Sequence, residues 1–260
     1  MTRHRMNAIF ILVFLSIPTG MWLVTNASIQ AMTFLLIGIL AILSRYGKLL
    51  SPMRDSLEIA FLYFALVQIA GNLGLTKFFP VNNVFILCAL YGFLFLLKKA
   101  TRKSLYVTRG NIRGFVGLSI VCGLLSAGAL AVWFYFQDGN PHARFVPGLP
   151  LPALLPLGLG FAVINASFEE GIFRSIFQAN FSMVIGSGAG ILLQALWFSF
   201  LHFQSGFPSG IPGLALTFVF GSLMGFLVNR TGGLLIPILI HTIADFSLFI
   251  LIILRMNGLF

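Results

Sequence analysis

Residues 166–177 read ASFEEGIFRSIF and place two adjacent glutamates and an arginine inside an apolar run that covers 152–178. A run of this length is long enough to cross a bilayer as one helix. Only six of the 260 residues are acidic, and 58% of the chain is hydrophobic. An ionisable group in hydrocarbon costs roughly 3 kcal/mol or more, so this stretch indicates both a membrane fold and a functional site.

Similar apolar runs recur along the whole chain. Charged residues make up 8% of the sequence, fewer than a soluble domain needs to cover its surface. No alternation of apolar and polar residues indicates a β-barrel. We therefore predict an all-α, polytopic membrane helix bundle of about eight or nine transmembrane helices. The predicted spans are 7–25, 28–43, 57–75, 80–97, 114–136, 152–178, 185–203, 212–228 and 233–254.

Much of the net charge of +10 lies in two loops. This distribution follows the rule that basic residues gather in cytoplasmic loops, so we expect no nucleic-acid partner. Both clusters are cytoplasmic if the amino terminus is, and anionic lipid is the partner we expect for them. The first cluster consists of Arg45, Lys48 and Arg54, and the second of Lys98, Lys99, Arg102, Lys103, Arg109 and Arg113.

The segment DGNPHARFVPGLPLP at 138–152 is the clearest loop, because it is rich in proline and glycine. We predict two parts, with generic membrane helices in 1–112 and the functional core in 113–260. Three of the six acidic residues and two of the four histidines fall within predicted spans of the second part. Cys88 and Cys122 both lie in apolar spans, which indicates no disulfide framework.

Helical geometry separates the two glutamates. Glu170 and Arg174 are four residues apart and share one helix face, with the acid on the N-terminal side, the better orientation for an ion pair. Such a pair can neutralise itself in a low-dielectric setting. Glu169 lies about 100° around the helix from Glu170 and can face a different neighbour. The two glutamates can therefore have different roles, one structural and one chemical.

Two histidines lie in later spans. His202 closes the sequence FSFLHF, where Phe198 lies one turn earlier and aromatic rings can keep a pocket dry. The alternative for His202 is a core histidine bonded to a neighbouring carbonyl. His241 and Asp245, in HTIADF, are four residues apart, so Asp245 can accept a bond from one ring nitrogen and leave the other for chemistry. A pair at this spacing is also compatible with simple mutual satisfaction.

These residue types suit hydrolysis. A glutamate and a histidine that flank one water can act as general base and acid, and a second histidine with an Asx residue one turn on can bind an oxyanion. The sequence contains no GxSxG setting for a serine nucleophile. HExxH is absent too, although Glu169, His202 and His241 can in principle form a zinc site with two histidines and one glutamate. We expect no cofactor, with zinc as the alternative.

Three motifs follow one another in the last predicted helices. EEGIFR fits EExxxR, FSFLH fits FxxxH, and HTIAD fits Hxxx(N/D). In this order they resemble the CAAX protease and bacteriocin-processing family (CPBP, also called Abi), which includes the type II CAAX prenyl endopeptidases. The phrase NRTGGLLIPILIHTIADF also resembles that family's approach to its last motif. The resemblance covers roughly residues 150–250.

The resemblance implies a glutamate-dependent, metal-independent intramembrane endopeptidase with a conical cavity open to the membrane and the cytosol. It implies that Glu169 and His202 activate the water, and that His241 and Asp245 bind the oxyanion. An ionised carboxylate only accepts hydrogen bonds, so Asp245 is either protonated or orients His241 and leaves donation to that ring. The implied supporting residues are Glu170, Arg174 and Phe198, of which Phe198 lines the cavity.

The implied substrate is a membrane-associated peptide or protein, prenylated on a CAAX tail in one branch of the family. We expect an integral, multi-pass protein of a bacterial plasma membrane rather than of the endoplasmic reticulum, with its active site towards the cytoplasmic half. Two other classes remain as alternatives. An ion-coupled transporter also concentrates polar groups in mid-membrane, usually in two repeated halves. A non-catalytic immunity or scaffold protein can share a fold with an enzyme.

Overall fold

The computed structural model describes residues 3–48, 50–136 and 146–259, and its regular elements are all helical. The predicted all-α bundle is confirmed, whereas most of the loop predicted at 138–152 lies outside the described residues. The main elements are α1 (Arg3–Pro18) with the π-helical η1 (Thr19–Leu23), α2 (Ala27–Tyr46), α3 (Arg54–Asn72), α4 (Val81–Gly92) with η4 (Phe93–Leu97), α5 (Val116–Tyr135), α6 (Leu151–Glu170), η6 (Gly171–Gln178), α7 (Ala179–Ile185), α8 (Ser187–Ser205), α9 (Gly210–Thr231) and α10 (Leu235–Met256). Two 3-10 turns, η2 (Ser51–Met53) and η3 (Leu75–Phe78), flank α3.

Six helical runs in the described part of the chain are long and apolar enough to cross a membrane. The predicted set of about eight or nine spans contains three further segments. Of these, α3 opens with Arg54, Asp55 and Glu58, α8 carries Gln194 and His202, and α4 with η4 is shorter than the six. The six runs are His4–Leu23, Ala27–Tyr46, Val116–Tyr135, Leu151–Ile185, Gly210–Thr231 and Leu235–Met256.

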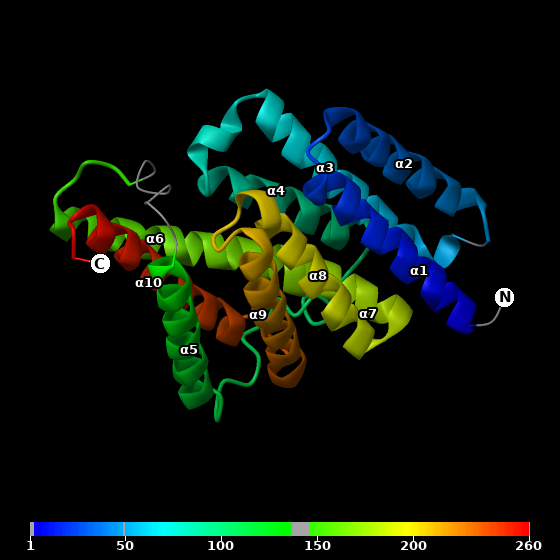
Figure 1. The fold of residues 1–260 in the computed structure, drawn as a ribbon. Coiled ribbons are helices and arrows are strands. Elements are labelled where there is room, and N and C mark those ends of the chain that lie inside the picture. The colour runs from blue at the N-terminus through cyan, green and yellow to red at the C-terminus, as the bar shows by residue number, and fades with distance from the viewer. Residues whose placement is uncertain (1–2, 49, 137–145, 260) are drawn as a thin grey trace.

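Helix α8 is central to the bundle and lies between α1 and α9 (Figure 1). Its Trp197 is fully buried, and the indole Nε1 donates a hydrogen bond of 2.5 Å to the carbonyl oxygen of Phe14 in α1. The same ring packs against Phe177 and Phe181, with centroid distances of 4.6 and 5.6 Å. Trp197 thus joins the first helix of the chain to the helices that carry the predicted site.

Small residues and buried amides fix α9 against its neighbours. Gln178 Nε2 donates to the carbonyl oxygen of Gly225 at 3.0 Å, and Gln194 Nε2 donates to that of Gly221 at 2.9 Å. A Cβ atom on Gly225 would lie 2.6 Å from Gln178 Oε1, so the close approach requires glycine there. Small residues allow helix backbones to approach in this way inside membranes.

Glycines also allow helix α10 to pack closely against α5 and α6. A Cβ atom on Gly158 of α6 would lie 2.2 Å from the ring of Phe249, and one on Gly123 of α5 would lie 2.8 Å from Ile243 Cδ1. Because these glycines let α10 approach closely, the end of α6 lies beside the middle of α10. This crossing positions the glutamates of α6 against the polar residues of α10.

Ion pairs join the two basic clusters at one end of the bundle. Glu58, which is buried, accepts from Arg45 Nε at 2.8 Å and contacts Lys98 Nζ at 2.5 Å. Lys98 Nζ also donates to Asp55 at 2.7 Å. Burial lowers the pKa of Lys98, but its hydrogen bonds to Asp55 and Glu58 outweigh this effect and hold the pKa above its usual value. Arg45 of the first cluster and Lys98 of the second therefore meet at Glu58.

Residues 98–113, which we call the basic strap, cross the ends of the site helices. Ser175 of η6 donates to the carbonyl oxygen of Leu105, a buried residue of the strap. Thr108 Oγ1 donates to the carbonyl oxygen of Gly232 at 2.7 Å, in the turn between α9 and α10. A Cβ atom on Gly110 would lie 2.7 Å from the carbonyl oxygen of Thr231, and φ there is +70°, so this crossing requires glycine.

Candidate active site

The last turn of α6 meets the second and third turns of α10. Glu170 Oε1 and His241 Nδ1 lie 2.8 Å apart, which is a hydrogen bond between residues 71 positions apart in the chain. Because a carboxylate only accepts, the proton of this bond lies on Nδ1 of the histidine. The structure therefore brings the first and third sequence motifs into direct contact.

The helix changes its winding immediately after the glutamates. The α-helix α6 ends at Glu170, and the next residues, Gly171–Gln178, form the π-helix η6. A Cβ atom on Gly171 would lie 2.9 Å from Leu87, so α4 packs tightly here as well. Short π-helical segments inside α-helices are frequent at functional sites. The sequence did not indicate this change.

Glu170 forms the predicted pair with Arg174. Arg174 Nε lies 3.2 Å from Glu170 Oε2, and both side chains are fully buried. The groups meet at ion-pair distance without the alignment of a hydrogen bond, and the guanidinium nitrogens make no hydrogen bond within the described residues. The guanidinium instead lies over the ring of Phe198, 4.4 Å from its centroid. The ion pair predicted from the spacing is confirmed.

The ring of His241 is bonded to Glu170 through Nδ1 and faces two other carboxylates through Nε2. Its Nε2 lies 3.5 Å from Glu169 Oε2 and 3.5 Å from Asp245 Oδ1. Asp245 was expected to fix the tautomer of this ring. The partner at hydrogen-bond distance is instead Glu170, which reaches Nδ1 across the helix interface. Asp245 shares the Nε2 side with Glu169.

Glu169 differs from its neighbour in burial and in bonding. Its side chain is 12% exposed, whereas that of Glu170 is fully buried. Glu169 Oε1 accepts a hydrogen bond of 3.2 Å from Asn165 Nδ2. Glu169 Oε2 has no hydrogen-bond partner among the described residues and is the atom that faces His241 Nε2. One oxygen is thus held by a hydrogen bond, while the other is buried and makes none among the described residues.

Asn165 is the residue that the sequence reasoning missed. Its Nδ2 also donates to Asp245 Oδ2 at 3.0 Å, so one amide group bridges two carboxylates on α6 and α10. A single asparagine in an apolar helix matches none of the motifs. The available signal was its position, four residues before Glu169 and hence on the same helix face.

His202 takes the arrangement that the sequence analysis gave as its alternative. Its Nδ1 lies 2.9 Å from the carbonyl oxygen of Phe198, and its ring packs against the Phe198 ring at a centroid distance of 4.4 Å. Among residues 3–48, 50–136 and 146–259, no hydrogen bond or ion pair joins it to Glu169. Because the carbonyl only accepts, the proton lies on Nδ1 and Nε2 keeps its lone pair. Phe198 is buried and packs between Arg174 and both histidines.

The described residues contain no group of three His, Cys, Asp or Glu side chains arranged to hold a metal ion. Glu169 and His241 face one another, but His202 is not joined to them by a contact. The three residues predicted as a zinc site thus do not form a ligand set in this arrangement.

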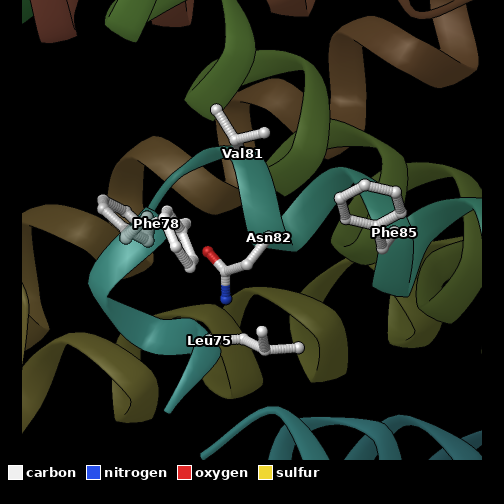
Figure 2. Close-up of a pocket in the computed structure, with 6 residues that line it drawn as sticks. Leu75, Phe78, Val81, Asn82 and Phe85 are labelled. Carbon is white, nitrogen blue, oxygen red and sulfur yellow. The ribbon is translucent and has the colours of Figure 1, made fainter. Parts of the chain in front are cut away.

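Two hollows in the described part of the chain lie away from these residues. One, of about 510 Å³, lies between η3 and the start of α4, and Figure 2 shows the Asn82 side chain between Phe78 and Leu75 there. The other, of about 590 Å³, is lined by residues that include Asn7, Asp55 and Asn180 of α1, α3 and α7. Neither contains a predicted site residue, so the conical cavity expected from the resemblance does not coincide with either.

Removing the guanidinium of Arg174 tests the buried pair. We expect Arg174→Ala to lower the free energy of unfolding by about 3–5 kcal/mol, because it leaves the Glu170 carboxylate buried with one partner fewer. The change is read as a lower melting temperature and a smaller yield of folded protein in detergent.

Arg113→Ala serves as the control, because Arg113 is exposed in the basic strap. A melting temperature of Arg174→Ala equal to that of Arg113→Ala would show that the pair contributes nothing to stability.

One comparison with known proteins covers the residues of this site. Residues 151–247 match a protein-family model described as type II CAAX prenyl endopeptidase Rce1-like. The matched segment extends from the start of α6 into α10 and includes Asn165, both glutamates, both histidines and Asp245. Searches of curated proteins and of solved structures found no match.

Proposed function

Residues 151–247 belong to the Rce1-like family of type II CAAX prenyl endopeptidases, and from this premise we propose a metal-independent glutamic mechanism for the chain. The family consists of CAAX endopeptidases, which are hydrolases that act on peptide bonds. The chain is accordingly an integral, multi-pass membrane protease of this type. We propose that its catalytic core lies within residues 113–260 and that 1–112 supports it through contacts such as that of Trp197 with Phe14.

The observation that carries the proposal is the unequal bonding of the two oxygens of Glu169. Asn165 holds Oε1, while Oε2 is unpaired among the described residues and faces the ring of His241. A general base needs a fixed position and one free lone pair, and this carboxylate has both. Glu170 also has a fixed position, but it is fully buried, with one oxygen bonded to His241 and the other at ion-pair distance from Arg174.

In the proposed reaction, Glu169 Oε2 takes a proton from water as the water oxygen attacks the carbonyl carbon of the scissile bond. His241, protonated on both ring nitrogens, donates a hydrogen bond from Nε2 to the oxyanion, and Asp245 stabilises the charge on that ring. The C–N bond breaks as the proton passes from Glu169 to the leaving amine. His202 contributes its Nε2 atom to this set of catalytic groups, because the proton on its Nδ1 is bound by the carbonyl oxygen of Phe198.

We propose a membrane-associated peptide or protein as the substrate, with a prenylated CAAX tail as the form to test first. Six membrane-length helices and a family of CAAX endopeptidases support this choice. An active site towards the cytoplasmic half is part of the same proposal, because the basic strap is tied to η6 through Ser175 and to the α9–α10 turn through Thr108.

We further propose that the basic strap binds anionic lipid. Five of its basic side chains are exposed, whereas Lys98 is partly buried in its ion pairs. Each basic residue near an anionic membrane surface contributes about 1 kcal/mol of attraction. The exposed residues are Lys99, Arg102, Lys103, Arg109 and Arg113.

Replacing the free carboxylate tests the mechanism. We expect Glu169→Gln to lower kcat by about 10²–10⁴-fold, because an amide cannot accept the proton of the water. The measurement is cleavage of quenched fluorescent peptides by detergent-purified protein, with farnesylated and unmodified CAAX peptides in the set, with and without a zinc chelator.

Chelator-resistant cleavage that is lost in Glu169→Gln is the expected result. The control is Asp55→Asn, which makes the same carboxylate-to-amide change at an exposed residue away from the helices of the site. This variant should cleave the peptides as the wild type does. Cleavage that survives in Glu169→Gln would refute the general base, and loss of wild-type cleavage in chelator would assign the reaction to zinc. If the wild-type protein cleaves no peptide, ion transport by it would favour the transporter alternative. Binding without cleavage would favour the scaffold alternative.

Neutralising the strap tests the lipid proposal. We expect the triple variant Lys99→Gln, Arg102→Gln, Lys103→Gln to retain fewer anionic lipids than the wild type, as counted by native mass spectrometry after extraction from mixed neutral and anionic bilayers. Lys77→Gln removes one charge next to the distant hollow and should retain as many lipids as the wild type. Equal retention by the triple variant would contradict the proposal.

A further inference from the structure

The geometry points to Asn165 as a positioning residue that holds the general base Glu169 and Asp245 in their working positions. This inference rests on the proposed function, because it assigns to Asn165 a role in the reaction of Glu169. The amide group of Asn165 contacts Glu169 and Asp245, the two carboxylates beside His241 Nε2.

The amide of Asn165 has two hydrogens on Nδ2, and each of two acceptors lies within reach of that nitrogen. Glu169 Oε1 is 3.2 Å away on the same helix, and Asp245 Oδ2 is 3.0 Å away on α10. Asn165 is 7% exposed, so water competes little for these bonds. The donor capacity of Nδ2 is therefore used fully inside the site.

Charge explains why a neutral donor suits this position. Glu169 and Asp245 both lie 3.5 Å from the same atom, His241 Nε2, so two like charges are crowded around one ring. The ion pair of Arg174 in the described part of the chain is with Glu170 rather than with either of them. In a low-dielectric interior, repulsion between the carboxylates would push them apart. A bridging amide donates to both without adding a charge of its own.

The bridge also determines which oxygen of Glu169 reacts. With Oε1 engaged by Asn165, the carboxylate presents Oε2 towards His241. A shift of about 1 Å in a reacting group can cost 10²-fold in rate. Loss of the amide should therefore affect the chemical step more than substrate binding.

Asn165→Leu keeps the approximate size of the side chain and removes the donor. We expect kcat to fall about 100-fold with KM unchanged within about twofold, on a peptide that the wild type cleaves. The control is Asn180→Leu, which removes another buried amide, one that donates to the carbonyl oxygen of Ile176 in its own helical run. The control should keep the kcat of the wild type.

A charge exchange tests the contact itself without relying on activity. Asn165→Asp places a third carboxylate beside Glu169 and Asp245 and should lower the melting temperature and kcat. Adding Asp245→Asn restores one amide and two carboxylates, so the double variant should recover most of the melting temperature and part of kcat. A coupling of this kind appears as non-additivity in a double-mutant cycle.

The possible outcomes separate the inference from the proposed function. Activity in Glu169→Gln would overturn the function and the inference together. An inactive Glu169→Gln with unchanged kcat in Asn165→Leu would overturn only the inference. If no peptide is cleaved, or Asn165→Leu does not fold, the thermal cycle decides: additive effects of Asn165→Asp and Asp245→Asn would overturn the bridge.

Discussion

A carboxylate that is completely buried among membrane helices must be neutralised by its neighbours, and the arrangement of this site depends on how Glu170 meets that constraint. Arg174 lies 3.2 Å from one oxygen, and His241 lies 2.8 Å from the other. These contacts tie η6, α6 and α10 together at one point. Removal of a partner from such a group is strongly destabilising, because the remaining charge stays buried.

The same contact orients the chemistry. With Nδ1 of His241 bound to Glu170, the ring presents Nε2 to Glu169 and Asp245. The adjacent glutamates thus differ in their surroundings, since Glu170 Oε2 pairs with Arg174 in a fully buried position, whereas Glu169 Oε2, among the described residues, faces only the ring of His241. Asn165 then donates a hydrogen bond to each of the two carboxylates on the Nε2 side. Positioning by buried neighbours of this kind is what a site in a low-dielectric interior requires.

Local spacing predicted the features that depend on one helix alone. Apolar run lengths located the helices, and the four-residue spacing of Glu170 and Arg174 predicted their ion pair. Spacing does not report contacts between helices, so the bond from Glu170 to His241 and the bridge by Asn165 were missed. For the same reason spacing predicts Asp245 as the partner of the His241 ring, whereas the crossing of α6 and α10 brings Glu170 closer.

The two roles assigned to the adjacent glutamates are tested most directly by thermal unfolding of Glu169→Gln and Glu170→Gln in the same detergent. The account predicts a clear drop in melting temperature for Glu170→Gln, because a neutral amide weakens the pair with Arg174 and the bond to His241. It predicts a melting temperature near that of the wild type for Glu169→Gln, whose side chain makes one hydrogen bond and is partly exposed. Equal shifts in the two variants, or a larger drop for Glu169→Gln, would contradict it.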